Sequence, residues 1–196
     1  HISGIAQSIN YYPVAHMKAD EGFAVAAFGL GTYVVEGWKS YRFSPKYPKI
    51  EMFTTKDLIN SSQVQFYALD CSKQNFDYLN KGELASLALL NISEAEKHGS
   101  LKHCVSVYNP ANDQIEPGLG TAGPRIINFA DILKFDYIPL ARTIHLMLDT
   151  VKEALGAPVE IEYAVDLNRT VNNLPSFYLL QIKPLVGSQL NQDIDF

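Results

Sequence analysis

Two segments near the C-terminus alternate between apolar and polar residues, as strands of a half-exposed sheet do. In PVEIEYAVDL the apolar residues share one face, which holds Val159, Ile161, Tyr163 and Val165. The other face holds Glu160, Glu162, Ala164 and Asp166. After a short loop, SFYLLQIKPL alternates so that a common face holds Phe177, Leu179, Gln181 and Lys183. The pattern predicts an antiparallel hairpin that closes between Asp166 and Phe177.

This hairpin brings four polar side chains together. Glu162 lies opposite Gln181 and Glu160 lies opposite Lys183, with Cβ atoms about 5 Å apart in each pair. Carboxylate and amide oxygens are ligands of divalent cations, and an ammonium group beside them can hold an anion. The alternative is an ordinary solvated sheet face, which shows the same alternation of polar and apolar residues. Phe177 is predicted on this face, which indicates that something covers it and favours a binding site.

Short strands and helices follow one another along the rest of the chain. Strands are predicted over residues 3–10, 22–28, 41–43, 63–71 and 104–108. In the first of these, Ile5 and Ile9 are expected to point inward. Helices are predicted over residues 84–98 and 136–155, and a short helical turn over residues 32–37. The order lacks the regular rhythm of a parallel sheet, so we expect an α+β fold with mainly antiparallel strands packed by helices.

The ends of the predicted helices follow from their capping residues. Thr32 is expected to cap the short turn, which Gly37 closes. Asp136 is the expected N-cap of the long helix, and Gly156 ends it.

Composition narrows the class of protein. The 196 residues are 47% hydrophobic and carry a net charge of −5, which predicts one domain and argues against a general nucleic-acid binder. No apolar run approaches the roughly 20 residues of a membrane helix. Cys71 and Cys104 form no CxxC motif, so we expect a reduced, cytoplasmic protein. The chain begins at His1 within strand-like sequence, so we expect it to be a piece of a longer protein.

The sequence contains two glycine clusters of the kind found in nucleotide-binding motifs. Residues 118–123 spell GxGxxG, but proline stands on both sides, so a flexible loop is favoured over a dinucleotide site. Gly29 and Gly31 follow a predicted strand, where either a tight turn or a nucleotide contact would use them. The five histidines show no metal-ligand spacing.

Three segments in order carry a resemblance to a known family. They are SGIAQSIN, GLGTYVVEG, and the pair VEIEYAVDL and FYLLQIKPL. Together they resemble the ATP-binding domain of the phosphoenolpyruvate synthase and pyruvate phosphate dikinase family, which has an ATP-grasp fold. The resemblance implies that residues 1–186 form the C-terminal part of that domain, as a partial ATP-grasp-like unit. Residues 187–196 would be a tail or a linker to a missing downstream domain.

The resemblance also implies roles for residues of the hairpin. Glu162 and Gln181 match the ligands of Mg²⁺ and of the ATP phosphates, and Glu160 matches the first acidic position of that strand. Lys183 stands where the family has arginine, as the phosphate-binding catalytic cation.

Other positions of the resemblance lie near the N-terminus. Ser3 and Gly4 are implied to lie over the nucleotide phosphates. Two residues depart from the family pattern. Thr32 stands where the family has glutamate, and lysine at position 183 lacks the bidentate fork of arginine.

The function implied by the resemblance is phosphoryl transfer with ATP and Mg²⁺ as cofactors. The parent would transfer phosphoryl from ATP to a histidine on another domain and then to pyruvate. Its implied partners are the N-terminal half of the ATP-grasp domain and a phosphohistidine carrier domain, so activity is expected of the parent and not of this chain alone. The two departures leave an alternative, a non-catalytic nucleotide-sensing or interaction module on the same fold.

Overall fold

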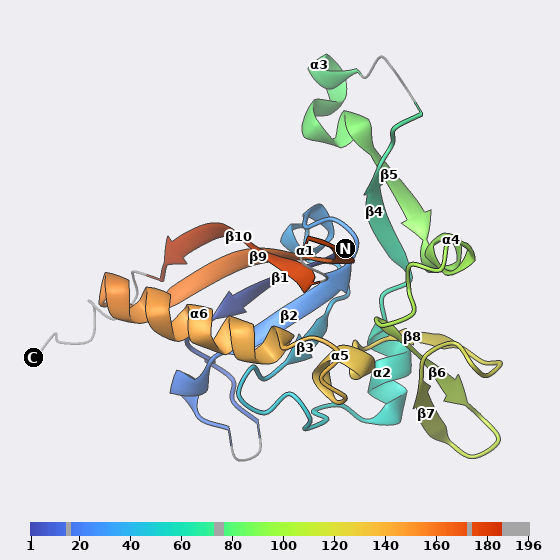
Figure 1. Cartoon of the computed structure of the whole chain (residues 1–196), viewed down its shortest axis with the longest axis horizontal. Helices are drawn as coiled ribbons and strands as arrows, with labels where there is room; N and C mark the ends of the chain where they lie inside the picture. Colours follow the sequence, from blue (N-terminus) through green and yellow to red (C-terminus); the bar gives the residue numbers. More distant parts are fainter. Residues whose placement is uncertain (15–16, 73–76, 172–173, 186–196) are drawn as a thin grey trace, which may run out of the picture.

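The computed structural model describes residues 1–14, 17–72, 77–171 and 174–185, so the predicted tail over 187–196 lies outside the described residues. A five-stranded antiparallel sheet forms the centre of the molecule, with strand order β10-β9-β1-β2-β3 (Figure 1). The strands are β1 (Ile2–Gln7), β2 (Phe23–Phe28), β3 (Tyr41–Phe43), β9 (Val159–Val171) and β10 (Leu174–Pro184). The central strand, β1, therefore pairs with segments from both ends of the chain.

Two smaller antiparallel sheets accompany the central one. They are formed by β4 (Gln65–Leu69) with β5 (Leu87–Asn91), and by β7 (Gln114–Pro117), β6 (Val105–Asn109) and β8 (Arg125–Ile127). The α-helices are α1 (Thr32–Val35), α2 (Thr55–Ser61), α3 (Tyr78–Lys81), α4 (Ile92–Lys97), α5 (Ala130–Leu133) and α6 (Leu140–Leu155). Short 3₁₀ helices cover Ala19–Glu21 and Gly82–Ser86. Figure 1 shows β4 and β5 projecting from the body, with α3 at the far end. These antiparallel sheets and helices confirm the predicted α+β class.

Helix α6 covers one face of the central sheet. Its apolar residues recur three and four positions apart, which places Ile144, Leu148 and Val151 on one side of the helix. They are buried in the same core as Ile161 and Val165 of β9. This face of the sheet is therefore the core face. No helix among the described residues is both long and apolar enough to cross a membrane.

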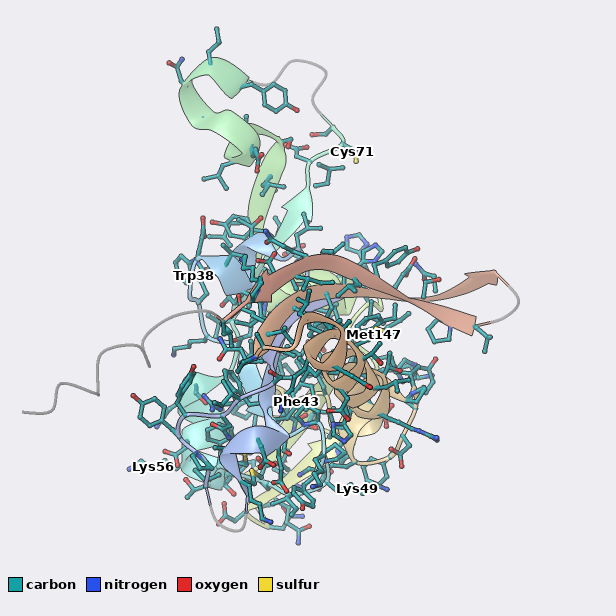
Figure 2. All side chains as sticks on the ribbon, turned by 90° about the vertical axis from the view of Figure 1, so that its left-hand side faces the viewer. Trp38, Phe43, Lys49, Lys56, Cys71 and Met147 are labelled. Atoms are coloured by element: carbon teal, nitrogen blue, oxygen red, sulfur yellow. The ribbon has the colours of Figure 1, made fainter. Side chains whose placement is uncertain are left out.

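The opposite face of the sheet is only partly covered. Tyr33 and Val34 of α1 are buried against Ala27, and Ile5 and Val25 pack beside them. Figure 2 shows Trp38, which follows α1, and Met147 of α6 on opposite sides of the strands. We call the sheet surface on the α1 side the α1 face. Beyond α1 it continues onto β9 and β10.

The register of β1 refines one prediction. Ile2 and Ala6 are fully buried on the core face, whereas Ile5 packs in the α1 cluster. Ile5 therefore points inward to the smaller cluster under α1 and not to the main core. Because both faces of this central strand are covered, its alternation does not reveal which face is the larger core.

The predicted helix over residues 84–98 was partly wrong. Residues Leu87–Asn91 form β5, which pairs with β4 along its whole length, and only Ile92–Lys97 are α-helical. The leucine-rich sequence suits a helix locally, but pairing with β4 satisfies the same backbone groups between strands. Gly99, with φ of 69°, follows α4 as predicted.

Capping residues were predicted better at C-termini than at N-termini. Gly156 is left-handed and its N–H donates to the carbonyl of Lys152, which confirms the predicted end of α6. Asp136 has a φ of 56° and precedes the helix, whose N-cap position is occupied by Pro139. The predicted Asp136 cap was wrong. So was the Thr32 cap, because Thr32 is the first residue of α1 and Gly31 holds the N-cap position.

The GxGxxG segment lies in the loop between β7 and β8. A dinucleotide site needs a helix N-terminus directly after the glycines, and here a strand follows. The interpretation as a loop is confirmed.

Glu21 is held by three hydrogen bonds at the end of the 3₁₀ helix that precedes β2. Its carboxylate accepts from Lys46 Nζ at 2.9 Å, from Tyr47 Oη at 3.2 Å and from the Lys18 backbone N–H at 2.9 Å. These donors, Lys46 first, lower the pKa of Glu21 to about 2. The ionised carboxylate therefore stabilises the fold.

We expect Lys46→Met to lower the free energy of unfolding at pH 7, and to lower it less in acid. The folded-state pKa of Glu21 is depressed, so its contribution is full above the unfolded value near 4.5 and is lost as pH falls toward 2. Urea unfolding followed by fluorescence of Trp38, the single tryptophan, at pH 7 and pH 3 measures this change. Lys56→Met, at an exposed position, is the control. A deficit of equal size at both pH values would contradict the role of Glu21.

Candidate functional site

The pairing of β9 and β10 brings the predicted hairpin residues together. Gln181 lies opposite Glu162 and Lys183 lies opposite Glu160, which confirms the predicted pairs. Both carboxylates come from the side of β9 that faces away from the core, since Ile161 and Tyr163 between and beside them are buried. The four polar side chains therefore share the α1 face of the sheet.

A β-bulge separates this polar end of β10 from its apolar end. Leu179 pairs with Tyr163 and Gln181 pairs with Glu162, so Leu180 is an extra residue without a partner on β9. One extra residue exchanges the faces of all that follow. Phe177 and Leu179 consequently lie on the core face, where the ring of Phe177 stacks on that of Tyr163 at 5.5 Å between centroids.

The bulge overturns two details of the sequence prediction. Phe177 and Leu179 do not share a face with Gln181 and Lys183, as strict alternation predicted. The other end of the hairpin is also shifted by one residue, because Asp166 pairs with Ser176 and not with Phe177. The apolar residues therefore cover the core and leave the polar patch open.

Lys183 is the positive centre of the patch. Its Nζ lies 2.5 Å from Glu162 Oε1 and 3.8 Å from Glu160 Oε1, and these carboxylates raise the pKa of Lys183. The lysine side chain is 46% exposed, whereas those of Glu162 and Glu160 are 22% and 16% exposed. The carboxylates are thus set into the sheet surface, and the ammonium group lies over them.

Gln7 is a member of the patch that the sequence analysis missed. Its Nε2 donates to Glu160 Oε2 at 2.6 Å from the neighbouring strand β1, where Gln7 pairs with Glu160. This hydrogen bond fixes the orientation of the Glu160 carboxylate. The only signal for Gln7 is the register between β1 and β9, which the pattern of either strand alone does not contain.

The patch has the donor chemistry of a magnesium site that shares its ion with a ligand. Within the described ranges no group of three or more His, Cys, Asp or Glu side chains is placed to hold a metal. The protein offers two carboxylates and the amide of Gln181. Mg²⁺ is commonly held by one or two carboxylates together with substrate phosphates and water. The two carboxylates and the amide oxygen are donor types that would suit Mg²⁺, with phosphate oxygens of a ligand and water completing its coordination.

Ser3 and Gly4 lie on different faces of β1. Ser3 is buried on the α1 face, opposite Ala164, and its Oγ donates to the carbonyl of Gly29 at 3.0 Å. This bond ties β1 to the turn that precedes α1. Gly4 lies on the core face opposite Tyr163, where a Cβ would be 2.5 Å from the tyrosine ring. The structure therefore brings Ser3, but not Gly4, to the face that carries the patch, and packing explains the glycine. Their contacts with a nucleotide stay predictions.

Comparison with known families identifies the kind of domain. The family described as pyruvate phosphate dikinase, AMP/ATP-binding domain, matches residues 1–193. A comparison with curated proteins gives no match. The family match covers the N-terminal strand, the turn at Gly29 and the β9–β10 hairpin, which are the three segments of the sequence resemblance. The chain therefore belongs to the family of pyruvate phosphate dikinase AMP/ATP-binding domains.

Proposed function

We propose that this chain supplies the Mg²⁺·ATP-binding sheet of a phosphoenolpyruvate synthase-like phosphotransferase. In the parent, phosphoryl would pass from ATP to a histidine on another domain and then to pyruvate. Family membership supports ATP as the nucleotide. The observation that carries the proposal is the β9–β10 register, which gathers Glu160, Glu162, Gln181 and Lys183 on one open face.

Each side chain has a role in this proposal. Glu162 and Gln181 hold Mg²⁺, which when bound neutralises charge on the phosphate oxygens. Glu160, whose carboxylate is oriented by Gln7, adds a second negative charge beside the ion from the neighbouring Glu160–Lys183 pair. The ammonium of Lys183 stabilises the negative charge that develops as phosphoryl leaves. All these side chains except Gln7 belong to one hairpin, whose paired backbone keeps them in place.

The remaining parts of the site would come from elsewhere in the parent. The N-terminal half of the ATP-grasp domain would close over the α1 face and add cations, and a phosphohistidine carrier domain would bring the acceptor. The α1 face is suited to such a cover because its polar end on β9 and β10 lies beyond α1. Enclosure strengthens every charge interaction with the phosphates.

A second function is favoured by the way the cation is held. Lys183 is paired with both carboxylates, and Thr32 replaces the glutamate of the family turn. A face with these features could bind a nucleotide without transferring phosphoryl. The alternative is therefore a nucleotide-sensing or interaction module on the same fold.

The test is phosphohistidine formation in the full-length protein supplied with labelled ATP and Mg²⁺. We expect label on a histidine outside this chain, and we expect it to disappear when Mg²⁺ is chelated. Nucleotide binding by calorimetry without any phosphohistidine would favour the sensing module. Absence of both binding and label would reject both functions.

A further inference from the structure

Arg42 is a cation on the α1 face that the proposed phosphoryl chemistry does not use. It lies on β3 opposite Val25 of β2. Val25 pairs in turn with Ile5 of β1, and Ile5 pairs with Glu162 of β9. Residues paired directly across strands share a face. Arg42 is therefore on the same face as the carboxylate patch, at the opposite edge of the sheet.

The guanidinium of Arg42 is fixed in place. Its Cζ lies 3.9 Å from the centroid of the Phe23 ring, and its Nη2 donates to Asn10 Oδ1 at 2.8 Å. Asn10 is buried, and its Oδ1 also accepts from the backbone N–H of Tyr12 at 3.1 Å. The Phe23 ring and an amide oxygen thus hold the guanidinium in place without neutralising it.

Among the described residues, Arg42 has no carboxylate partner, in contrast to three lysines near the sheet. In the described part of the chain its side chain forms no ion pair, whereas Lys183, Lys46 and Lys134 each contact a glutamate. Burial lowers the pKa of Arg42. Within the described ranges its one hydrogen bond is that of Nη2 to Asn10, and a partly buried guanidinium with further donors available is a preformed site for an anion.

The contact with Phe23 places the guanidinium of Arg42 at the end of a neighbouring row of paired residues. Phe23, Gln7, Glu160 and Lys183 are successive partners across β2, β1, β9 and β10. Strands are about 4.8 Å apart, so Phe23 and Lys183 are separated by roughly 14 Å. The lysine at one end is neutralised by carboxylates, and the arginine at the other end is not.

We propose that Arg42, held by Phe23 and Asn10, binds a terminal phosphate group at the β2–β3 side of the nucleotide face. A guanidinium fork donates two parallel hydrogen bonds to two oxygens of such a group. The group is either the γ-phosphate of ATP or free phosphate, because both present the same oxygens. The inference rests on the proposed function only for the identity of the nucleotide.

The experiment compares wild-type and Arg42→Gln full-length protein in three titrations. The ligands are the Mg²⁺ complex of β,γ-imido-ATP, that of ADP, and inorganic phosphate added to the ADP-saturated protein. A bond to a charged group typically contributes enough for roughly a 10- to 100-fold change in affinity. If the γ-phosphate is the ligand, the substitution weakens the affinity for the triphosphate by that factor and the affinity for ADP by less than about twofold. If free phosphate is the ligand, only the phosphate titration loses affinity.

The controls separate this role from a structural one. Arg42→Lys keeps the charge but not the fork, so we expect an intermediate loss for the same ligand. Arg142 is exposed on α6, which covers the opposite face of the sheet. Arg142→Gln removes an equal charge there and should leave the affinity for all three ligands unchanged. Unchanged affinity for all three ligands, or an equal loss for ATP analogue and ADP, would overturn the proposal. Wild-type protein that binds phosphate but no nucleotide would reject the proposed function. In that case phosphate titrated without ADP into the wild-type and Arg42→Gln proteins tests the role of Arg42, and equal affinities would overturn it.

Discussion

Replacing Glu162 by glutamine should lower the rate of phosphoryl transfer from ATP roughly 100- to 1,000-fold. The substitution keeps the shape of the side chain and its place opposite Gln181, but removes the carboxylate that contacts Lys183 and would hold Mg²⁺. Without that charge the ion is bound more weakly, and the ammonium of Lys183 loses its nearest anchor. The rate of phosphohistidine formation in the full-length protein, at saturating Mg²⁺·ATP, measures the effect.

The matched control is Glu153→Gln, which removes the same charge from an exposed position on α6. It should transfer phosphoryl at the wild-type rate. Calorimetry with Mg²⁺·ATP separates the causes, because a weaker affinity in Glu162→Gln indicates lost ground-state binding and an unchanged affinity indicates a loss confined to the transition state. A Glu162→Gln protein as fast as wild type would remove this residue from the site.

The largest expected effect on stability comes from a single methyl group at Gly4. A Cβ at this position would lie 2.1 Å from the Val25 carbonyl oxygen and 2.5 Å from the Tyr163 ring. The oxygen belongs to the backbone of the central sheet, and the Tyr163 hydroxyl also donates to it at 3.0 Å. Neither neighbour can move without separating β1 from β2 or displacing a buried ring, so Gly4→Ala should lower the free energy of unfolding by about 3 kcal/mol or more.

Urea unfolding followed by circular dichroism measures this loss, with Gly120→Ala as the control. Gly120 has no heavy atom within 4 Å of an added Cβ and no positive φ, so its substitution should be nearly neutral. Equal stability of the Gly4→Ala and wild-type proteins would show that β1 tolerates a side chain on its core face. In that case the glycine would need an explanation other than packing.

The sequence predicted the parts of the site that depend on one strand pair. Alternation in PVEIEYAVDL correctly divided β9 into a buried and a polar face, and the pairs Glu162–Gln181 and Glu160–Lys183 were confirmed. The bulge at Leu180 could not be predicted, because Leu-Leu in a strand has no residue that marks an irregularity. The pairs were right even though the predicted faces of Phe177 and Leu179 were wrong.

Contacts between segments far apart in the sequence could not be predicted. Gln7 reaches Glu160 across 153 positions, and Arg42 reaches Asn10 across 32. A period-two pattern gives the face of a residue within its own strand, but strand order and register decide which neighbour it meets. The same limit explains β5, whose pairing with β4 replaced the predicted helix.

The bulge also has a consequence for comparing this hairpin with its relatives. On the hairpin side of Leu180, Phe177 and Leu179 lie on the core face, while beyond it Gln181 and Lys183 lie on the α1 face. A homologue that lacks one residue here would exchange its interior and ligand-facing positions on one side of the gap. An ungapped alignment would then match a packing residue to a ligand, so functional positions in β10 are best transferred by counting from Gln181 outward.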